Sequence, residues 1–184
     1  MRIISGQFKG RKLSPVRGIR TRPTADRVRE ALFSILGPIE AHTLVLDLFA
    51  GTGALGIEAL SRGARRAVFV DRDYHSLITL NKNIAHCNLQ ACTQVYRWDI
   101  TKNLNCLKPY ARQFDLVFLD PPYHQNLIPQ TLARLLLLEV LNPVATLVAE
   151  HAADETIVAP EGLICEDQRI YGQTRLSFLS LSKM

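Results

Sequence analysis

Residues 46–56 read Leu-Asp-Leu-Phe-Ala-Gly-Thr-Gly-Ala-Leu-Gly, and this stretch decides the fold. Its three glycines, Gly51, Gly53 and Gly56, fit the spacing G-x-G-x-x-G. An apolar run precedes them, and a segment with helical spacing follows. Because glycine lacks a Cβ atom, a loop of this composition can turn sharply and bring its backbone close to a cofactor. The stretch therefore predicts the strand, loop and helix that open a cofactor-binding α/β domain.

Downstream of this loop, apolar runs of strand length alternate with segments of helical periodicity. Strands are expected at 44–49, 67–70, 93–98, 114–119 and 145–150, helices at 54–62, 74–87 and 127–141, and a weak helical segment at 101–111. Two β-rich runs, 163–171 and 174–181, flank Gly172-Gln173 and predict an antiparallel hairpin. An alternating order of this kind builds a parallel sheet with helices on both faces, and the closing hairpin makes the sheet mixed.

The first 30 residues carry most of the positive charge. They hold nine basic and two acidic side chains, whereas the whole chain has a net charge of +5, so the remainder is slightly acidic. A cationic arm on a nearly neutral body indicates a polyanionic partner. A solvated, disordered basic tail is the alternative, but Ile3, Phe8 and the turn residues Gly6 and Gly10 favour a short hairpin that folds onto the body. The side chains expected to contact nucleic acid are Lys9, Arg11, Lys12, Arg20, Arg22 and Arg27.

Residues 23–36 connect this arm to the body. Their apolar side chains recur at helical spacing, Pro23 and Thr24 are typical of a helix start, and Gly37-Pro38 ends the pattern. The chain is therefore expected to form a basic N-terminal hairpin extension over residues 1–22 and one compact unit over residues 23–184.

Two carboxylates indicate which cofactor the glycine loop serves. Asp71 comes 20 residues after Gly51, at the end of the next strand, where it can accept both hydroxyl protons of a ribose. This geometry suits NAD and S-adenosylmethionine alike. Asp47 lies inside a buried apolar strand, where a carboxylate is costly without a partner. It favours S-adenosylmethionine, whose methionine end carries an ammonium group, although a structural Asp bonded to backbone amides remains an alternative.

Asp99 follows the third strand and has two interpretations. It can accept a hydrogen bond from an adenine amino group, or it can cap a helix over 101–111. The residues expected to bind the cofactor are Asp47, Phe49, Ala50, Gly51, Thr52, Gly53, Asp71, Arg72, Asp99 and Ile100.

The fourth strand ends in Asp120-Pro121-Pro122-Tyr123, which is expected to be the catalytic corner. Two prolines fix φ and remove two backbone donors, so the corner is rigid and rich in acceptors. The exocyclic amine of a purine is a poor nucleophile because its lone pair is delocalised into the ring. If Asp120 and the Pro121 carbonyl accept its two N–H groups, the lone pair can turn toward a methyl donor, and Asp120 can take up the released proton. Tyr123 would stack on the base.

The composition argues against several other classes of protein. The four cysteines form no C-x-x-C pair, so we expect reduced core thiols and no metal site. The first residues lack the apolar core of a signal peptide, and the longest aliphatic run, 135–138, is far too short to span a membrane. A cytoplasmic protein without a membrane partner is therefore expected.

Several motifs carry a resemblance to a known family. Residues 46–53 resemble the cofactor motif of Rossmann-like methyltransferases, and residues 120–123 resemble the (Asn/Asp)-Pro-Pro-(Tyr/Phe) motif of members that methylate amines. Segments 6–13, 22–33 and 171–174 complete the pattern. Together they are similar, over essentially the whole chain, to the RsmD family of bacterial 16S ribosomal RNA guanine-N2 methyltransferases.

This resemblance implies a monomer with the seven-stranded class I S-adenosylmethionine-dependent fold, a basic hairpin that touches RNA, and a guanine of 16S rRNA as target, within an assembling or assembled small subunit. Because Tyr123 alternates with Phe in such motifs, its hydroxyl is expected to matter little. The alternatives are a DNA adenine-N6 or protein glutamine methyltransferase, an RNA-binding assembly factor without catalysis, and a nicotinamide-dependent oxidoreductase. His124, next to the corner, can be a bystander or a proton acceptor.

Overall fold

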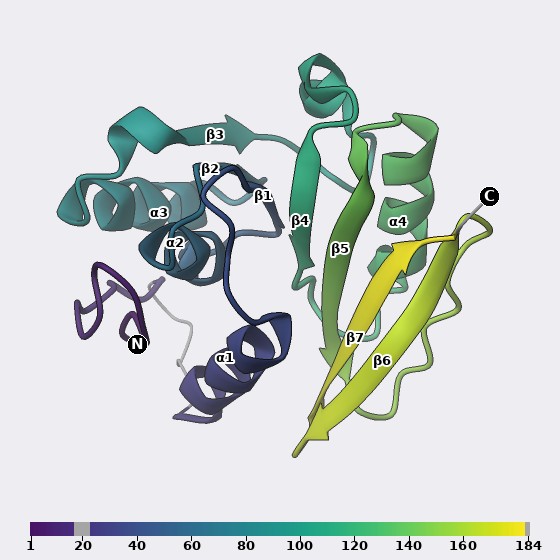
Figure 1. Ribbon diagram of the computed structural model, residues 1–184, viewed down its shortest axis with the longest axis horizontal. Helices are drawn as coiled ribbons and strands as arrows, with labels where there is room; N and C mark the ends of the chain where they lie inside the picture. Colours follow the sequence, from purple (N-terminus) through teal and green to yellow (C-terminus); the bar gives the residue numbers. More distant parts are fainter. Residues whose placement is uncertain (17–22, 183–184) are drawn as a thin grey trace.

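In the computed structural model, which describes residues 1–16 and 23–182, seven strands among those residues form one mixed sheet in the order β3-β2-β1-β4-β5-β7-β6 (Figure 1). The strands are β1 Leu44–Leu48, β2 Arg66–Asp71, β3 Thr93–Arg97, β4 Phe114–Leu119, β5 Leu141–Ala152, β6 Leu163–Tyr171 and β7 Thr174–Leu181. The helices are α1 Pro23–Leu36, α2 Ala54–Ser61, α3 Tyr74–His86 and α4 Leu127–Leu137, with short 3₁₀ turns at Gln90–Cys92 and Asn105–Tyr110. The expected class of fold, a Rossmann-like mixed sheet, is confirmed.

The strand order reverses between β1 and β4, and this reversal positions the site. β1 pairs in parallel with β2 on one side and with β4 on the other, so that Asp47 stands opposite Phe69 and Phe118. The connections after β1 and β4 leave in opposite directions. In sheets of this kind a crevice opens outside the carboxyl ends of the strands at the point of reversal.

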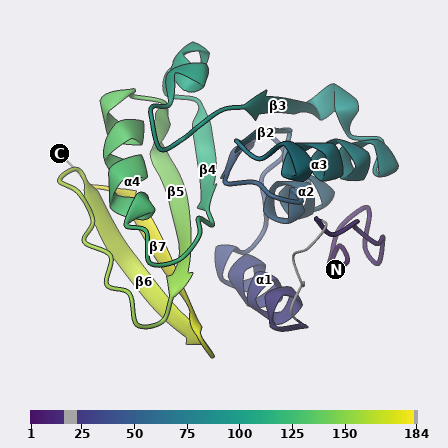
Figure 2. The ribbon, with the colours of Figure 1, turned by 180° about the vertical axis from the view of Figure 1, so that it is seen from behind.

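Two apolar cores lie on opposite faces of the sheet. On one face α1, α2, α3 and the N-terminal residues pack against the strands, with Phe33, Ile57 and Leu80 buried among them. On the other face α4 and the turn at Asn105–Tyr110 cover the sheet, with Leu107 and Leu132 fully buried. Figures 1 and 2 show α2 and α3 beside β2 and β3, and α4 beside β5. β1 is consequently buried from both faces, as its continuous apolar run predicts.

The N-terminal residues fold back on themselves but do not form a regular hairpin. A single antiparallel bridge joins Arg2 to Lys12, and the residues between them make turns. Ile3 and Leu13 are buried against the body, so residues 1–16 do not form a solvated tail. Gly6 lies close against α2: its φ is +80°, and a Cβ atom there would lie 1.8 Å from the Ser61 carbonyl oxygen. The arm is therefore shaped by its contact with α2 more than by cross-strand pairing.

Three predicted elements have clearly different limits in the structure, and one of them is the strand expected at 145–150, which runs from Leu141 to Ala152. The helix expected at 127–141 ends at Leu137, because Glu139 adopts a positive φ of 50° and Leu141 already pairs with Phe114 as the start of β5. The weak helix expected at 101–111 shortens to the 3₁₀ turn at Asn105–Tyr110.

The cysteine prediction needs a correction as well. All four thiols are free, but only Cys87 is buried, while Cys165 is exposed on the edge strand β6. No helix among the described residues combines the length and apolarity needed to cross a membrane.

Candidate active site

A cleft of about 1350 Å³ opens at the carboxyl ends of β1, β2 and β4. The glycine loop, from Phe49 to Thr52, forms one part of its wall, and the corner Asp120–Tyr123 forms another. The turn of the β6–β7 hairpin, with Gly172 and Gln173, also lines it. The glycine loop and the Asp120–Tyr123 corner therefore share one cleft.

The glycine loop is held against β2 by a carboxylate. Gly51 N donates to Asp71 Oδ2 at 2.8 Å, and the other oxygen, Oδ1, accepts from Asp73 N at 2.8 Å. Each oxygen of an ionised carboxylate can accept about two hydrogen bonds, so both retain one place for a donor in the cleft. Gly53 differs from the expectation because it does not line the cleft; a Cβ atom there would lie 2.3 Å from Leu80 Cδ1, so its role is in packing.

Asp47 combines the two interpretations of the sequence. The residue is 2% exposed, and its Oδ2 accepts from Gly56 N at 2.9 Å, as a structural Asp would. It also lines the cleft, as a cofactor-binding group would. Burial, reinforced by the nearby Asp71 carboxylate, raises the pKa of Asp47 to about 8 in spite of the Gly56 hydrogen bond. A cation in the cleft would offset that cost.

Asp99 closes a local turn and does not cap a helix. Its Oδ1 accepts from Thr101 Oγ1 at 2.6 Å and from Thr101 N at 3.1 Å, while the next helical turn starts only at Asn105. The Thr101 hydroxyl contributes most to lowering the pKa of Asp99. Arg72 Nη1 lies 3.9 Å from Asp99 Oδ1, and both residues line the cleft together with Ile100.

The Asp120 carboxyl projects into the cleft. It is accessible to solvent there, while protein surrounds it on the other sides. Withdrawal from bulk water, together with the charges of Glu150 and Asp47, raises the pKa of Asp120 well above its usual range. Pro121, which follows it, is buried. The corner thus holds a carboxylate of raised basicity beside a fixed backbone.

Tyr123 is anchored through its hydroxyl, a contact that its alternation with Phe in such motifs does not indicate. It donates to Glu150 Oε1 at 3.0 Å and lies 3.2 Å from Thr174 Oγ1. Tyr123 has one hydroxyl proton, which it donates to Glu150. The Thr174 hydroxyl is therefore the donor in its hydrogen bond with Tyr123. The aromatic ring is therefore fixed to the ends of β5 and β7.

Sequence reasoning missed Glu150 and Arg29, both of which line the cleft. Glu150 ends the apolar run of β5, so the signal that identified Asp71 and Asp120, an acid at a strand end, could have found it. Burial raises the pKa of Glu150, against the opposing effects of Tyr123 and Arg29. Arg29 is 4% exposed and its Nε has no hydrogen-bond partner, although its Nη2 donates to the Arg2 carbonyl. Arg29 lies within a helix and not at the end of a strand, so its position in the sequence did not indicate that it lines the cleft.

His124 is exposed and lines the cleft, with the centre of its ring 6.5 Å from that of Tyr123. Its backbone N–H donates to Glu155 Oε1 at 2.7 Å, and its Nε2 lies 4.0 Å from Asp154 Oδ1. The polar contacts of His124 are thus with the loop after β5, which favours the bystander role.

The described basic side chains that are predicted to contact RNA fall into two groups. Lys9, Lys12 and Arg27 are exposed. Arg11 is half-buried, donates to the His86 carbonyl at 2.8 Å and lies 5.0 Å from the centre of the Phe8 ring, so it helps to fold the arm. The two other predicted RNA contacts, Arg20 and Arg22, lie outside the described residues.

A family model described as Conserved hypothetical protein 95 matches residues 1–180. "Putative rRNA methyltransferase YlbH" of Bacillus subtilis is 40% identical over 177 residues, covering 95% of each chain. "Ribosomal RNA small subunit methyltransferase D" of Haemophilus influenzae is 39% identical over 163 residues, which cover 88% of this chain and 83% of that protein. The solved structure of "Putative methyltransferase yhhF" from Escherichia coli superimposes with a TM-score of 0.84 at 32% identity, covering 98% and 97% of the two chains.

Proposed function

The chain belongs to the family described as Conserved hypothetical protein 95, the RsmD family, and on this premise we propose that it methylates ribosomal RNA. The proposed reaction transfers a methyl group from S-adenosylmethionine to the exocyclic N2 amine of a guanine in 16S rRNA. The observation that carries the proposal is the convergence of Asp47 and Asp71 with Asp120 on one cleft. The names of the similar proteins support the rRNA substrate.

The donor set of the cleft fits S-adenosylmethionine. Asp71 retains an acceptor site on each oxygen, which suits the two hydroxyls of a ribose. Burial raises the pKa of Asp47, and an ammonium group beside it would favour the ionised carboxylate, whereas the diphosphate of a nicotinamide cofactor would favour the protonated form and gain no ion pair. When bound, S-adenosylmethionine supplies an electrophilic methyl group on a sulfonium centre.

The corner residues perform the work on the target base. Asp120 and the Pro121 carbonyl accept the two N–H groups of the amine, which frees the nitrogen lone pair for in-line attack. The amine then loses one proton, and Asp120, whose pKa is raised, is suited to take it. Tyr123 stacks on the base, and its hydrogen bonds to Glu150 and Thr174 hold the ring in one orientation.

The basic arm favours structured RNA as substrate. Exposed Lys9 and Lys12 can contact phosphates, while bases in RNA loops are already unstacked and accessible to a narrow cleft. We propose that the partner is 16S rRNA within the small subunit and that the enzyme acts as a monomer.

A labelling experiment tests the function. The protein is incubated with methyl-labelled S-adenosylmethionine and, separately, small-subunit RNA, DNA or total protein, with Asp120→Ala as the inactive control. Label in the RNA, mapped to a guanine N2, is the expected result. Label only in DNA would assign an adenine methyltransferase instead, and RNA binding without label would leave an assembly factor. A melting shift with NAD and none with S-adenosylhomocysteine would point to an oxidoreductase.

A further inference from the structure

One buried side chain joins the N-terminal arm to the glycine loop. Asn83, on α3, is 1% exposed. Its Oδ1 accepts from Ser14 N at 2.8 Å, and its Nδ2 donates to the Ser14 carbonyl at 3.1 Å. The same Nδ2 donates to the Thr52 carbonyl at 2.9 Å. The side-chain amide thus pairs with Ser14 as a neighbouring strand would, and it also holds the loop that leads into α2.

This arrangement leaves Asn83 little freedom. Its amide makes three of the four hydrogen bonds available to it, all to backbone atoms. Each of those backbone groups would lose its partner if the amide moved away, and an unpaired buried polar group is costly. A displacement of Thr52 is therefore transmitted to Ser14, and a displacement of Ser14 to Thr52.

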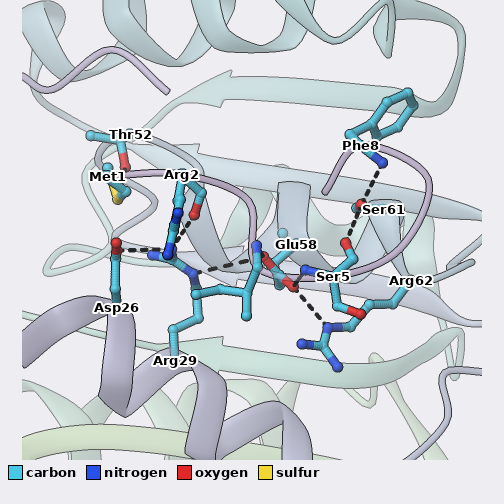
Figure 3. Close-up of polar contacts among 12 residues, drawn as sticks. Met1, Arg2, Ser5, Phe8, Asp26, Arg29, Thr52, Glu58, Ser61 and Arg62 are labelled. Atoms are coloured by element: carbon cyan, nitrogen blue, oxygen red, sulfur yellow. Dashed lines mark hydrogen bonds and ion pairs between the residues drawn. The ribbon is translucent and has the colours of Figure 1, made fainter. Parts of the chain in front are cut away.

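Further contacts fix the arm to α2, the helix that follows the loop (Figure 3). Glu58, which is fully buried, accepts from Ile4 N at 2.7 Å and from Ser5 N at 2.9 Å, and Arg62 Nε donates to it at 2.8 Å. Ser61 Oγ accepts from Phe8 N at 3.0 Å. The arm therefore rests on the same helix whose N-terminus carries the glycine loop.

The arm also reaches the cleft itself. Met1 lines it, and the Thr52 hydroxyl lies 3.9 Å from Met1 Sδ (Figure 3). Thr52 is thus contacted by the arm through its side chain and by Asn83 through its carbonyl. The next residue back, Gly51, bonds to Asp71. The residue that contacts the arm, Thr52, thus directly follows the residue that bonds to Asp71.

We propose that Asn83 is a positioning residue that couples the seating of the arm to occupation of the cofactor cleft. A ligand that orders the glycine loop fixes the Thr52 carbonyl, which strengthens the hold of Asn83 on Ser14. Linkage is reciprocal, so RNA that orders the arm tightens cofactor binding by the same factor. The coupling rests on the proposed function in one respect, namely that the cleft binds S-adenosylmethionine or its product.

Hydrogen exchange on the full chain tests this coupling without RNA. S-adenosylhomocysteine is expected to slow exchange of the Ile4, Ser5 and Ser14 amides about threefold to tenfold, the factor that one hydrogen bond supplies. In Asn83→Ala the ligand still binds, with an affinity lower by a similar factor, but it no longer slows exchange at Ser14. Asn81→Ala is the matched control, because Asn81 is exposed on the same helix and its Nδ2 donates within α3, to Leu77.

Three outcomes would overturn the inference. If wild-type protein binds S-adenosylhomocysteine and exchange of the arm amides does not change, the arm and the cleft are not coupled. If Asn83→Ala responds to the ligand as wild type does, another residue carries the coupling. Failure of wild-type protein to bind the ligand would refute the proposed function first. If Asn83→Ala does not fold, Ser14→Pro replaces it, since it removes from the arm the N–H that Asn83 accepts. Loss of the Ile4 and Ser5 response to the ligand is then expected, and a retained response contradicts the coupling.

Discussion

The Tyr123 hydroxyl and Glu150 Oε1 are joined by a 3.0 Å hydrogen bond that ties the end of β4 to the end of β5. The base-stacking ring is therefore fixed from outside its own loop. In addition to desolvation, the Glu150 charge contributes to raising the pKa of both Tyr123 and Asp120. One acidic side chain thus orients the aromatic wall and influences the proton acceptor.

The anchoring of Tyr123 predicts a graded response to substitution. Tyr123→Phe keeps the stacking face but loses the hydroxyl, so kcat should fall about twofold to tenfold. Tyr123→Ala also loses stacking and should lower kcat/KM about tenfold to a hundredfold. Steady-state methylation of small-subunit RNA measures both. Equal activity of wild type and Tyr123→Phe would restore the view that the hydroxyl matters little.

Substitutions of Asp120 separate its two roles. Asp120→Ala removes the acceptor and should lower kcat by a factor of about 10² to 10⁴, while S-adenosylhomocysteine still binds. Asp120→Asn keeps a carbonyl oxygen for one N–H but cannot take up a proton, so it should retain partial activity. Its rate should also lose the rise with pH that ionisation of Asp120 gives the wild type. Full activity in Asp120→Ala contradicts the assignment.

Asp47 predicts how stability depends on pH. Its pKa is about 8 in the folded protein against an ordinary value of 3.8, so the folded state holds the proton more tightly. The resulting stabilisation is complete below the ordinary value and is lost as the pH rises through 8. Asp47→Asn cannot ionise, so its Tm relative to wild type should increase between about pH 4 and about pH 8 and then level off. Thermal melts measure this difference in Tm. A difference that does not change with pH would show that burial does not raise the pKa of Asp47.

The exposed lysines of the arm predict a salt effect on RNA binding. Replacing Lys9 and Lys12 by Gln should weaken binding and reduce the slope of log Kd against log salt by less than about one unit per side chain. Lys108→Gln is a suitable control, because Lys108 is exposed in the turn on the opposite face of the sheet. Identical slopes for the arm variant and wild type would make the arm a purely structural element.

Two glycines of the arm offer a matched test of its docking. Gly6 and Gly10 have nearly equal φ angles of +80° and +82°, but only at Gly6 does a Cβ atom meet another backbone, that of Ser61. Gly10→Ala should cost about 1 kcal/mol from backbone strain alone. Gly6→Ala should cost more, because the arm must also lift from α2. Chemical denaturation compares them, and equal losses would mean that the contact is easily relaxed.

Local patterns predicted much of this molecule. The continuous apolar run of β1 and the glycine loop after it depend on neighbouring residues, and both were placed correctly. The limit between α4 and β5 was misplaced, because the apolar residues on both sides of Glu139 fit either element until Leu141 pairs with Phe114. Such pairing depends on tertiary structure that no window of sequence contains.

In the candidate site, too, the residues with a local sequence signal were predicted and those that depend on tertiary contacts were not. Asp71 and Asp120 were recognisable as acids at the ends of strands, next to motifs of known chemistry. Asn83 was not, because its partner Ser14 lies 69 residues away and an asparagine on a helix carries no local signal. Arg29 was masked by a helical pattern that explained only its apolar neighbours.

The turn at Gly172-Gln173 overhangs the cleft, yet the β6–β7 hairpin that carries it lies at the margin of the sheet. The same hairpin carries Thr174, whose hydroxyl lies 3.2 Å from that of Tyr123. A change in the length of the turn is therefore expected to alter the orientation of the Tyr123 ring as well as the rim of the cleft.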